Sequence, residues 1–313
     1  MTYLAKINLK RSLTVTLISI LVVPLLMYAS LCFSRPPRSD IEQQLFQGIS
    51  YQREARSQPR PLMLHVVTID LTAPGLRFLV TPEERTDDGL EVKAQTTSTF
   101  LAKHGLQLAV NASFFHPFYE KSPWDYSPRS GEGTNILGQS ISNGNIYSPA
   151  EKIWPVLCIF ADNKAEIRHE KCAPGTTQGV AGNRFLLETG DRVPLDIDIA
   201  EAKLMPSTAV AINNQADKLF IVVVDGRQPF YSEGVNLAEF TDILIELGAY
   251  TALNLDGGGS STLVIAQNGK PTLLNAPIHT RLPMRLRPVA NHLGIYAQPV
   301  VSVTSDQVKN SDQ

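Results

Sequence analysis

The sequence predicts an α+β fold, in which one domain is built around a mixed, largely antiparallel β-sheet with a few helices, after an N-terminal membrane segment. Apolar stretches of strand length recur along the chain in hairpin-like pairs, and only a few segments have helical periodicity. The strict alternation of strand and helix that is typical of parallel sheets is not found. The 313 residues, 43% hydrophobic and 19% charged, have an ordinary globular composition.

The N-terminus predicts a membrane segment. Lys6, Lys10 and Arg11 precede an uncharged, mostly apolar run over residues 12–34, which is long enough to span a bilayer. The basic flank places residues 1–11 in the cytoplasm, so the domain is expected to be membrane-anchored on the periplasmic or extracellular side. The alternative is secretion after cleavage of a signal peptide, although the apolar region of such a peptide is usually only about 7–15 residues long.

Three regions are expected after the membrane segment. Residues 35–60 are polar and proline-flanked and are interpreted as a linker, within which Asp40–Phe46 is a helix candidate. Residues 61–299 have the apolar patterns of a folded domain, and residues 300–313 form a polar tail. The net charge of −2 gives no overall basic surface, so nucleic acid is not expected as a partner. The oligomeric state stays open.

Apolar runs bounded by turn residues predict the strands of the domain. In chain order these runs are Leu62–Asp70, Leu76–Val80, Leu106–Val110, Trp154–Phe160, Glu166–His169, Ala209–Asn213, Leu219–Val224, Thr251–Leu255, Ser261–Ala266 and Val289–Ala297. Two helices are predicted: Thr96–His104, which Gly105 ends, and Leu237–Leu247, whose apolar residues recur at helical spacing before Gly248. Residues 114–149, rich in proline, glycine and serine, are expected to form long loops, which are often functional.

The chain contains three cysteines. Cys32 lies in the apolar N-terminal run, whereas Cys158 and Cys172 are in the part expected to be exported. A hairpin predicted over residues 154–169 would bring these two together, and an oxidising compartment would permit a disulfide. Two free buried thiols are the alternative, and the sequence does not decide between them.

The sharpest local signal is the segment Asn-Leu-Asp-Gly-Gly-Gly-Ser over residues 254–260. A buried strand ends at Asp256, and Gly257, Gly258 and Gly259 follow it. Glycine lets a ligand approach the backbone closely, and successive N–H groups can form a nest for an anion. The alternative is a tight hairpin, for which three consecutive glycines carry a large entropy penalty. The segment lacks the Lys-Ser/Thr of a nucleotide-binding P-loop and the spacing of a serine nucleophile elbow.

Two further strand ends carry polar groups. Asp225 and Arg227 follow a hydrophobic strand, and the guanidinium could grip phosphate oxygens bidentately. Asn111 ends another predicted strand, and Phe115 follows closely, so that an amide for a sugar hydroxyl stands beside an aromatic ring. Taken singly, each pair has a plain structural explanation. Asp225 and Arg227 would form a turn with a surface salt bridge, and Asn111 and Phe115 would belong to a core aromatic pair with a capping asparagine, which is the preferred explanation for that motif alone.

The fourth motif is Val-Ala-Asn-His over residues 289–292. His292 titrates near neutrality, but a lone histidine is more often structural. In their order along the chain, Asn-x-x-Phe-Phe, Asp-Gly-Arg, Asn-Leu-Asp-Gly-Gly-Gly-Ser and Val-Ala-Asn-His resemble the phosphodiester glycosidase family over about Gly48 to Ala297. That family comprises hydrolases that cut sugar-phosphate diesters, and its bacterial members include proteins linked to exopolysaccharide.

The sequence departs from the family pattern at three places. Ser207 and Thr208 stand where the family often has Arg-Thr, and Ala211 replaces a glycine that follows. Ala112 replaces the glycine of Asn-Gly-x-Phe-Phe. A lost arginine would weaken phosphate binding or change the substrate.

The resemblance implies that water attacks the anomeric carbon of a sugar while a phosphomonoester leaves. It implies catalytic roles for Asp256 and Asp225, although which acid does what stays open. The expected substrate-binding residues are Arg227, Asn111, Phe115, Gly257, Gly258, Gly259, Ser260, Asn291 and His292. No organic cofactor is expected; a divalent metal held by the acids stays open, although no clear ligand pattern is present.

The alternative function is that of a non-catalytic glycan-binding protein in exopolysaccharide assembly. Such a protein would keep the aromatic residues and the glycine segment but tolerate loss of a phosphate clamp, and Ser207 supports it. The presence of Asp225, Arg227 and Asp256 argues against it. Under either function the partner is a sugar-phosphate or glycan, with the membrane contacted through residues 12–34.

Overall fold

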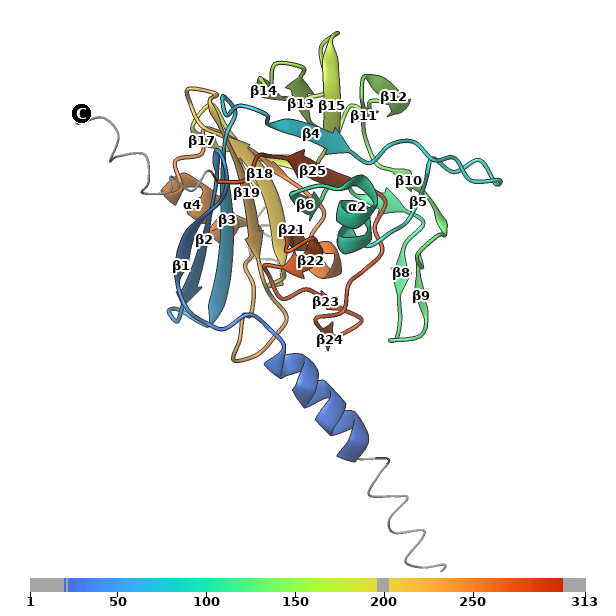
Figure 1. Cartoon of the computed structure of the whole chain (residues 1–313), viewed down its shortest axis with the longest axis vertical. Helices are drawn as coiled ribbons and strands as arrows, with labels where there is room; N and C mark the ends of the chain where they lie inside the picture. The colour runs from blue at the N-terminus through green and yellow to red at the C-terminus, as the bar shows by residue number, and fades with distance from the viewer. Residues whose placement is uncertain (1–19, 21, 196–202, 301–313) are drawn as a thin grey trace, which may run out of the picture.

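Antiparallel sheets dominate the computed structural model, which describes residue 20, residues 22–195 and residues 203–300 (Figure 1). The largest sheet has eight strands, in the order β1-β2-β3-β19-β18-β20-β16-β17. Their bounds are β1 Ile41–Phe46, β2 Ile49–Arg56, β3 Leu62–Asp70, β16 Arg184–Glu188, β17 Asp191–Arg192, β18 Ser207–Ile212, β19 Lys218–Val224 and β20 Thr251–Asn254. The prediction of a largely antiparallel architecture is confirmed, but every strand pair among the described residues is antiparallel, so the predicted mixed character is wrong.

Two five-stranded sheets pack against the inner face of the large sheet. The first has the order β22-β21-β6-β25-β4 and the second the order β12-β11-β15-β13-β14. Their bounds are β4 Arg77–Val80, β6 Leu108–Asn111, β21 Leu263–Gln267, β22 Lys270–Leu273, β25 His292–Tyr296, β11 Ser140–Ser142, β12 Asn145–Ser148, β13 Val156–Phe160, β14 Ala165–Arg168 and β15 Thr176–Ala181. A turn at Asn268 and Gly269 connects β21 to β22.

Short strands complete the domain. One sheet has the order β5-β10-β7, and two hairpins pair β8 with β9 and β23 with β24. Their bounds are β5 Val92–Lys93, β7 Phe115–His116, β8 Tyr119–Glu120, β9 Tyr126–Ser127, β10 Gly133–Ile136, β23 Ile278–His279 and β24 Leu282–Pro283. Residues 114–149, expected to be loops, therefore contain several short strands, which their mixed turn and aromatic composition conceals.

Side-chain alternation along the strands produces two apolar layers. In β19, Ile221 and Val223 face the five-stranded sheets, while Val222 and Val224 face the opposite side. Helix α4 (Leu237–Glu246) covers that opposite side with Phe240. The central sheet is thus buried on both faces, so its strand ends form a rigid frame for polar groups.

Both predicted helices are confirmed, each with one bound that differs by one residue. Helix α2 (Thr97–His104) begins after the N-cap Thr96 and ends at Gly105, which has the left-handed conformation that glycine favours. Helix α4 begins with a capping box in which Asn236 and Glu239 exchange side-chain and backbone hydrogen bonds. This capping box fixes the start of α4 and the loop before it, which borders the candidate site.

The interpretation of residues 35–60 as a linker is wrong. Strands β1 and β2 pair with one another, and β2 pairs with β3 over its whole length, so this segment extends the large sheet. The helix candidate Asp40–Phe46 corresponds to β1. Ile49 and Tyr51 point into the main core, and more polar, less buried residues alternate with them along β2. This alternation indicates a strand, but the polar composition of the segment concealed it.

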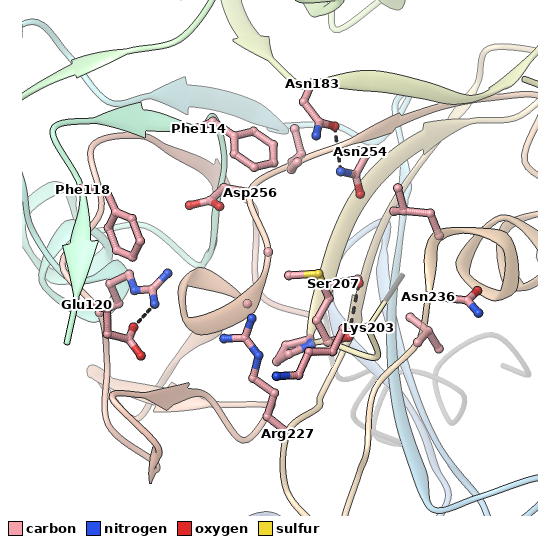
Figure 2. A pocket seen from close by; sticks show the side chains of 18 residues that line it. Phe114, Phe118, Glu120, Asn183, Lys203, Ser207, Arg227, Asn236, Asn254 and Asp256 are labelled. Carbon is pink, nitrogen blue, oxygen red and sulfur yellow. Dashed lines mark hydrogen bonds and ion pairs between the residues drawn. The ribbon is translucent and has the colours of Figure 1, made fainter. Parts of the chain in front are cut away.

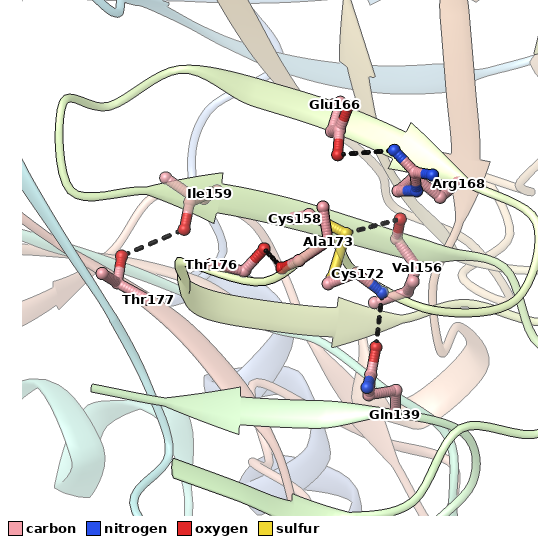
Figure 3. Close-up of a disulfide and its surroundings, with 10 residues drawn as sticks. All are labelled: Gln139, Val156, Cys158, Ile159, Glu166, Arg168, Cys172, Ala173, Thr176 and Thr177. Carbon is pink, nitrogen blue, oxygen red and sulfur yellow. Dashed lines mark hydrogen bonds and ion pairs between the residues drawn. A yellow bond between two sulfur atoms is a disulfide. The ribbon is translucent and has the colours of Figure 1, made fainter. Parts of the chain in front are cut away.

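Cys158 and Cys172 form a disulfide, which settles the alternative that the sequence left open (Figure 3). Cys158 lies in β13, and Cys172 follows the predicted β13–β14 hairpin, which is confirmed. The backbone N–H of Cys172 also donates to the Gln139 side chain at 2.7 Å. The bridge ties the segment after the hairpin to the centre of the second five-stranded sheet.

Residues 22–33 are helical and lead into β1 from one end of the domain (Figure 1). They are most of the described part of the predicted membrane segment; residues 1–19 and 21, like the predicted tail beyond residue 300, lie outside the described residues. Among the described residues, no helix combines the length and the apolar character needed to cross a bilayer.

Candidate functional site

A cavity of about 650 Å³ opens where β18, β20 and the loops after β19 and β20 meet (Figure 2). Polar and aromatic side chains from distant parts of the sequence line it. They are Phe114, Phe118, Glu120, Asn183, Lys203, Ser207, Arg227, Asn236, Asn254, Asp256 and Arg287. Gly257 and Gly258 also line the wall. The cavity therefore contains Asp256, Arg227 and part of the glycine segment, as predicted.

Asp256 follows β20 directly and is held by its backbone. Its N–H donates to the Ala112 carbonyl at 2.9 Å, and its own carbonyl accepts from the Asn111 side chain at 2.6 Å. Burial raises the pKa of the Asp256 carboxyl to about 6, although the nearby Arg287 and Arg227 and hydrogen bonds from Ser260 and Gly257 oppose this shift. A carboxyl that titrates near neutrality in a cavity is suited to proton transfer or charge stabilisation.

Two guanidinium groups pack against Gly258 and Gly259, so neither position has room for a side chain. A Cβ atom on Gly258, whose φ is +62°, would lie 3.2 Å from the Arg227 guanidinium. A Cβ atom on Gly259 would lie 2.4 Å from Arg287 Nη2. The glycine segment is thus a cradle for two arginines, a role that the local sequence pattern does not predict.

The predicted anion nest is only partly supported. The N–H of Gly258 donates to the Pro206 carbonyl at 2.8 Å, and that of Ser260 donates to the Gly257 carbonyl at 3.1 Å, within the short 3₁₀ helix η1 (Gly258–Ser260). These two N–H groups are therefore already engaged. Positive charge in this cavity comes from side chains instead.

Arg287 is buried and fixed from several sides. It forms an ion pair with Glu120, donates to Ser260 Oγ at 3.2 Å, and lies 4.6 Å over the Phe118 ring. Hydrogen bonding from His279 and the charge of Arg287 lower the pKa of Glu120 to about 2. Glu120 is therefore ionised throughout the physiological range and is committed to orienting Arg287.

Arg227 has a different character. It follows the end of β19, has a positive φ of 58°, and its backbone N–H donates to the Glu233 carbonyl at 3.1 Å. Its guanidinium points into the cavity (Figure 2) and has no hydrogen bond or ion pair to any described residue. The Arg227 guanidinium is therefore available to an anionic ligand, whereas that of Arg287 is already paired with Glu120.

Asp225 does not belong to this site, so the prediction of two catalytic aspartates in one pocket is wrong. Its carboxylate is buried beneath the sheet end, where it accepts hydrogen bonds from Asn275 Nδ2 at 2.9 Å and from the Ala276 N–H at 3.0 Å. It also contacts His65 Nε2 at 3.0 Å, and His65 Nδ1 contacts the Tyr51 hydroxyl at 2.8 Å. Asp225 is a structural anchor.

Asn111 and Phe115 are likewise not ligand-binding residues in this structure. Asn111 is completely buried, and its side chain donates to the Asp256 carbonyl and accepts from the Thr262 N–H at 3.0 Å. It positions Asp256 through the backbone. Phe115 is buried in a small apolar cluster and meets Phe118 edge-on, with ring centroids 6.0 Å apart.

Asn291 and His292 are also outside the cavity. Asn291 Nδ2 donates to the hydroxyls of Ser113 and Ser140 at 3.0 and 3.1 Å. His292 is fully buried and stacks on Phe100 at 4.6 Å, and desolvation lowers the pKa of its imidazole to about 3. Both residues support β25, and the prediction that they bind substrate is wrong.

Sequence reasoning missed much of the lining. The additional residues are Phe114, Phe118, Glu120, Asn183, Lys203, Asn236, Asn254 and Arg287. Arg287 stands just before the Val-Ala-Asn-His motif, and two aromatics and Glu120 come from the loop-rich region, so weak signals existed. Ser207, noted as a departure from the family pattern, does line the cavity.

Among the described residues, no three His, Cys, Asp or Glu side chains gather as a metal site.

Comparisons of the fold identify solved structures of similar architecture. A Burkholderia pseudomallei protein described as exported has a TM-score of 0.59 and 13% identity, over 84% of this chain and 97% of that one. The catalytic domain of zebrafish N-acetylglucosamine-1-phosphodiester alpha-N-acetylglucosaminidase, auto-inhibited by pro-peptide, has a TM-score of 0.54 and 17% identity, over 86% and 93%. A hypothetical protein from Synechocystis has a TM-score of 0.51 and 16% identity over 85% of this chain, which spans 64% of that protein's length.

Sequence comparison gives the family. No curated protein sequence matches the chain. The family model of the phosphodiester glycosidases, however, matches residues 104–296, which include the glycine segment, Arg227 and Arg287. The chain therefore belongs to the phosphodiester glycosidase family of hydrolases.

Proposed function

We propose that the protein hydrolyses a sugar-1-phosphodiester and releases free sugar and a phosphomonoester. The observation that carries this proposal is Asp256, a carboxyl with a pKa of about 6 that lies beside the guanidinium groups of Arg227 and Arg287. An acid suited to a positively charged sugar ring thus stands next to Arg227, a cation that is available to a phosphate. Family membership supports the same reaction class.

The proposed chemistry needs one carboxylate. A water oxygen forms a bond to the anomeric carbon, the bond from that carbon to the bridging phosphate oxygen breaks, and its electrons leave with the phosphomonoester. Because a phosphomonoester has a second pKa near 6, it leaves with little help from a general acid. Ionised Asp256 accepts the water proton or stabilises the oxocarbenium-like ring, and Arg227 stabilises the departing charge.

The lining suggests where each half of the substrate binds. Phe114, Asn183 and Asn254 lie on one side of the cavity, and Lys203 and Arg227 lie on the other (Figure 2). Asn183 Oδ1 accepts from Asn254 Nδ2 at 2.8 Å, which leaves a donor on Asn183 and an acceptor on Asn254 for sugar hydroxyls. We assign the sugar to the amide side and the phosphate to the cationic side, with Asp256 between them.

We further propose that the reaction takes place outside the cytoplasm, on a glycoconjugate of the envelope, with residues 12–34 as the membrane anchor. The basic flank before that run supports this orientation. The Cys158–Cys172 disulfide also supports it, because disulfides persist in oxidising compartments.

The direct test is incubation of the purified protein with a panel of chromogenic sugar phosphodiesters that differ only in the sugar. We expect at least one to yield free sugar and phosphomonoester in equal amounts, measured by chromatography. Saturable binding of the same diesters without any turnover would instead support the non-catalytic glycan-binding alternative.

The pH dependence follows from the raised pKa of Asp256. A carboxyl whose pKa is about 6 is largely protonated at pH 5 and ionised at pH 7. Because the reaction uses the ionised form, we expect kcat/KM to fall about tenfold per pH unit below about 6 and to level off above it. A rate that rises as the pH is lowered through 6 would show that the protonated acid is the active form.

A further inference from the structure

A second cavity, of about 880 Å³, joins the candidate site to the N-terminal helical segment. It is lined by Glu120, Lys203 and Arg227, which also line the first cavity, and by Tyr28 of the segment over residues 22–33. Gln228, Pro229, Leu204, Ile278 and Arg281 complete most of its wall. A ligand whose phosphate contacts Arg227 could therefore continue into this second cavity, which we name the exit groove.

The end of the N-terminal helical segment is fastened to the loop that carries Arg227. Arg38 Nη1 donates to the Tyr231 carbonyl at 2.7 Å, and the Tyr231 hydroxyl donates to the Pro36 carbonyl at 3.0 Å. The Arg35 guanidinium lies 4.5 Å over the Tyr231 ring and donates to the Gln228 side chain at 3.3 Å. The exit groove is therefore held at a fixed position beside the helical segment.

The end of the domain next to the N-terminal helical segment exposes large aromatic side chains. Phe33 is 89% exposed, Phe230 92% and Trp124 77%. Trp124 lies in the β8–β9 hairpin, whose Pro123 carbonyl accepts from Arg285 at 2.7 Å, so this hairpin contacts the segment after β24. In Figure 1 the β8–β9 and β23–β24 hairpins reach toward the end from which the N-terminal helical segment leaves. Of these residue types, tryptophan is the one enriched at membrane–water interfaces.

The charges of the exit groove favour an anionic ligand. Lys203, Arg227 and Arg281 contribute three cations, whereas of its two acids, Glu120 and Glu233, Glu120 is already paired with Arg287. Arg281 is exposed in the β23–β24 turn and has no hydrogen bond or ion pair to any described residue. Basic side chains at a membrane surface attract anionic headgroups by about 1 kcal/mol each.

We infer that the substrate is a membrane-held sugar phosphodiester, whose lipid alcohol leaves the catalytic cavity through the exit groove toward the bilayer. This inference rests on the proposed function and specifies its substrate class. The sugar enters between the amides and Asp256, the phosphate is held by Arg227 and Lys203, and the alcohol passes Tyr28 and Ile278 to the lipid. The N-terminal anchor then places the groove at the depth where the headgroup lies.

The test compares two diesters of the same sugar that differ only in the alcohol. The full-length protein is reconstituted in vesicles of phosphatidylcholine and anionic phosphatidylglycerol and given either a hexadecyl phosphodiester in the same vesicles or a methyl phosphodiester in solution. In Arg281→Glu, we expect hydrolysis of the hexadecyl diester to fall about tenfold or more, since the change replaces attraction to the anionic headgroups by repulsion. Hydrolysis of the methyl diester, which does not reach the groove, should change by less than about twofold.

A matched charge reversal at the far end of the domain is the control. Lys164→Glu, on the β13–β14 hairpin, should leave both rates unchanged. If Arg281→Glu affects both diesters equally, or if the hexadecyl diester is not cleaved while the methyl diester is, the inference is overturned and the proposed function stands. If neither diester is cleaved for any sugar of the panel, the proposed function fails and the inference with it.

Discussion

Asp256→Asn should reduce kcat on a sugar phosphodiester by about 10²–10³ or more while leaving the protein folded. The substitution keeps the size of the side chain and removes the charge that the reaction uses. Burial raises the pKa of this carboxyl above its usual value, so its ionised form is less favourable in the folded protein than in the unfolded chain at neutral pH. Removing the charge should therefore not lower the melting temperature at pH 7.

The measurement is steady-state kinetics together with thermal melting. Asp162→Asn, at an exposed acid in the turn after β13, serves as the control and should change neither quantity. Near-normal turnover in a folded Asp256→Asn protein would remove Asp256 from the mechanism.

Asp225→Asn should give the opposite pattern, although both acids follow buried strands of the same sheet. The amide cannot accept all the hydrogen bonds that Asn275, Ala276 and His65 direct at the carboxylate. Buried donors left without an acceptor, and a His65 side chain left without its carboxylate partner, should lower the free energy of unfolding by about 3 kcal/mol or more. That loss corresponds to a melting temperature lower by roughly 6–12 °C for a domain of this size.

Kinetics measured well below that melting temperature separate stability from catalysis. The folded Asp225→Asn protein should keep a kcat within a few-fold of the unsubstituted protein, because Asp225 lies outside the cavity. An unchanged melting temperature combined with lost turnover would restore Asp225 to the catalytic role that the sequence suggested.

The contrast between these two aspartates shows how far the sequence could lead. Both stand at the end of a hydrophobic strand beside glycine, and this local pattern correctly places each at the same end of the sheet. Which way a strand-end side chain points depends on what covers it. Asp225 is covered by Asn275 and Ala276, some 50 positions away in the chain, and no local pattern contains that contact.

The glycine segment illustrates the same limit in another form. Its glycines correctly indicate that other groups approach the backbone closely. The groups that do so are the side chains of Arg227 and Arg287, whereas the sequence suggested a ligand. The strands with strong apolar patterns, such as β3 and β19, were predictable because burial on both faces demands continuous apolar residues. The polar strands β1, at the edge of the sheet, and β2, next to it, were missed because β1 is largely exposed and only one side of β2 is buried.

The proposed mechanism requires that the bond between the anomeric carbon and the phosphate oxygen is the one that breaks. Hydrolysis of a sugar phosphodiester in oxygen-18-labelled water, followed by mass spectrometry of the products, identifies the broken bond. If Asp256 and Arg227 act as proposed, the phosphomonoester is unlabelled and the label enters the anomeric hydroxyl of the sugar. A labelled phosphomonoester would mean that water attacks phosphorus, and would contradict the proposed roles of Asp256 and Arg227.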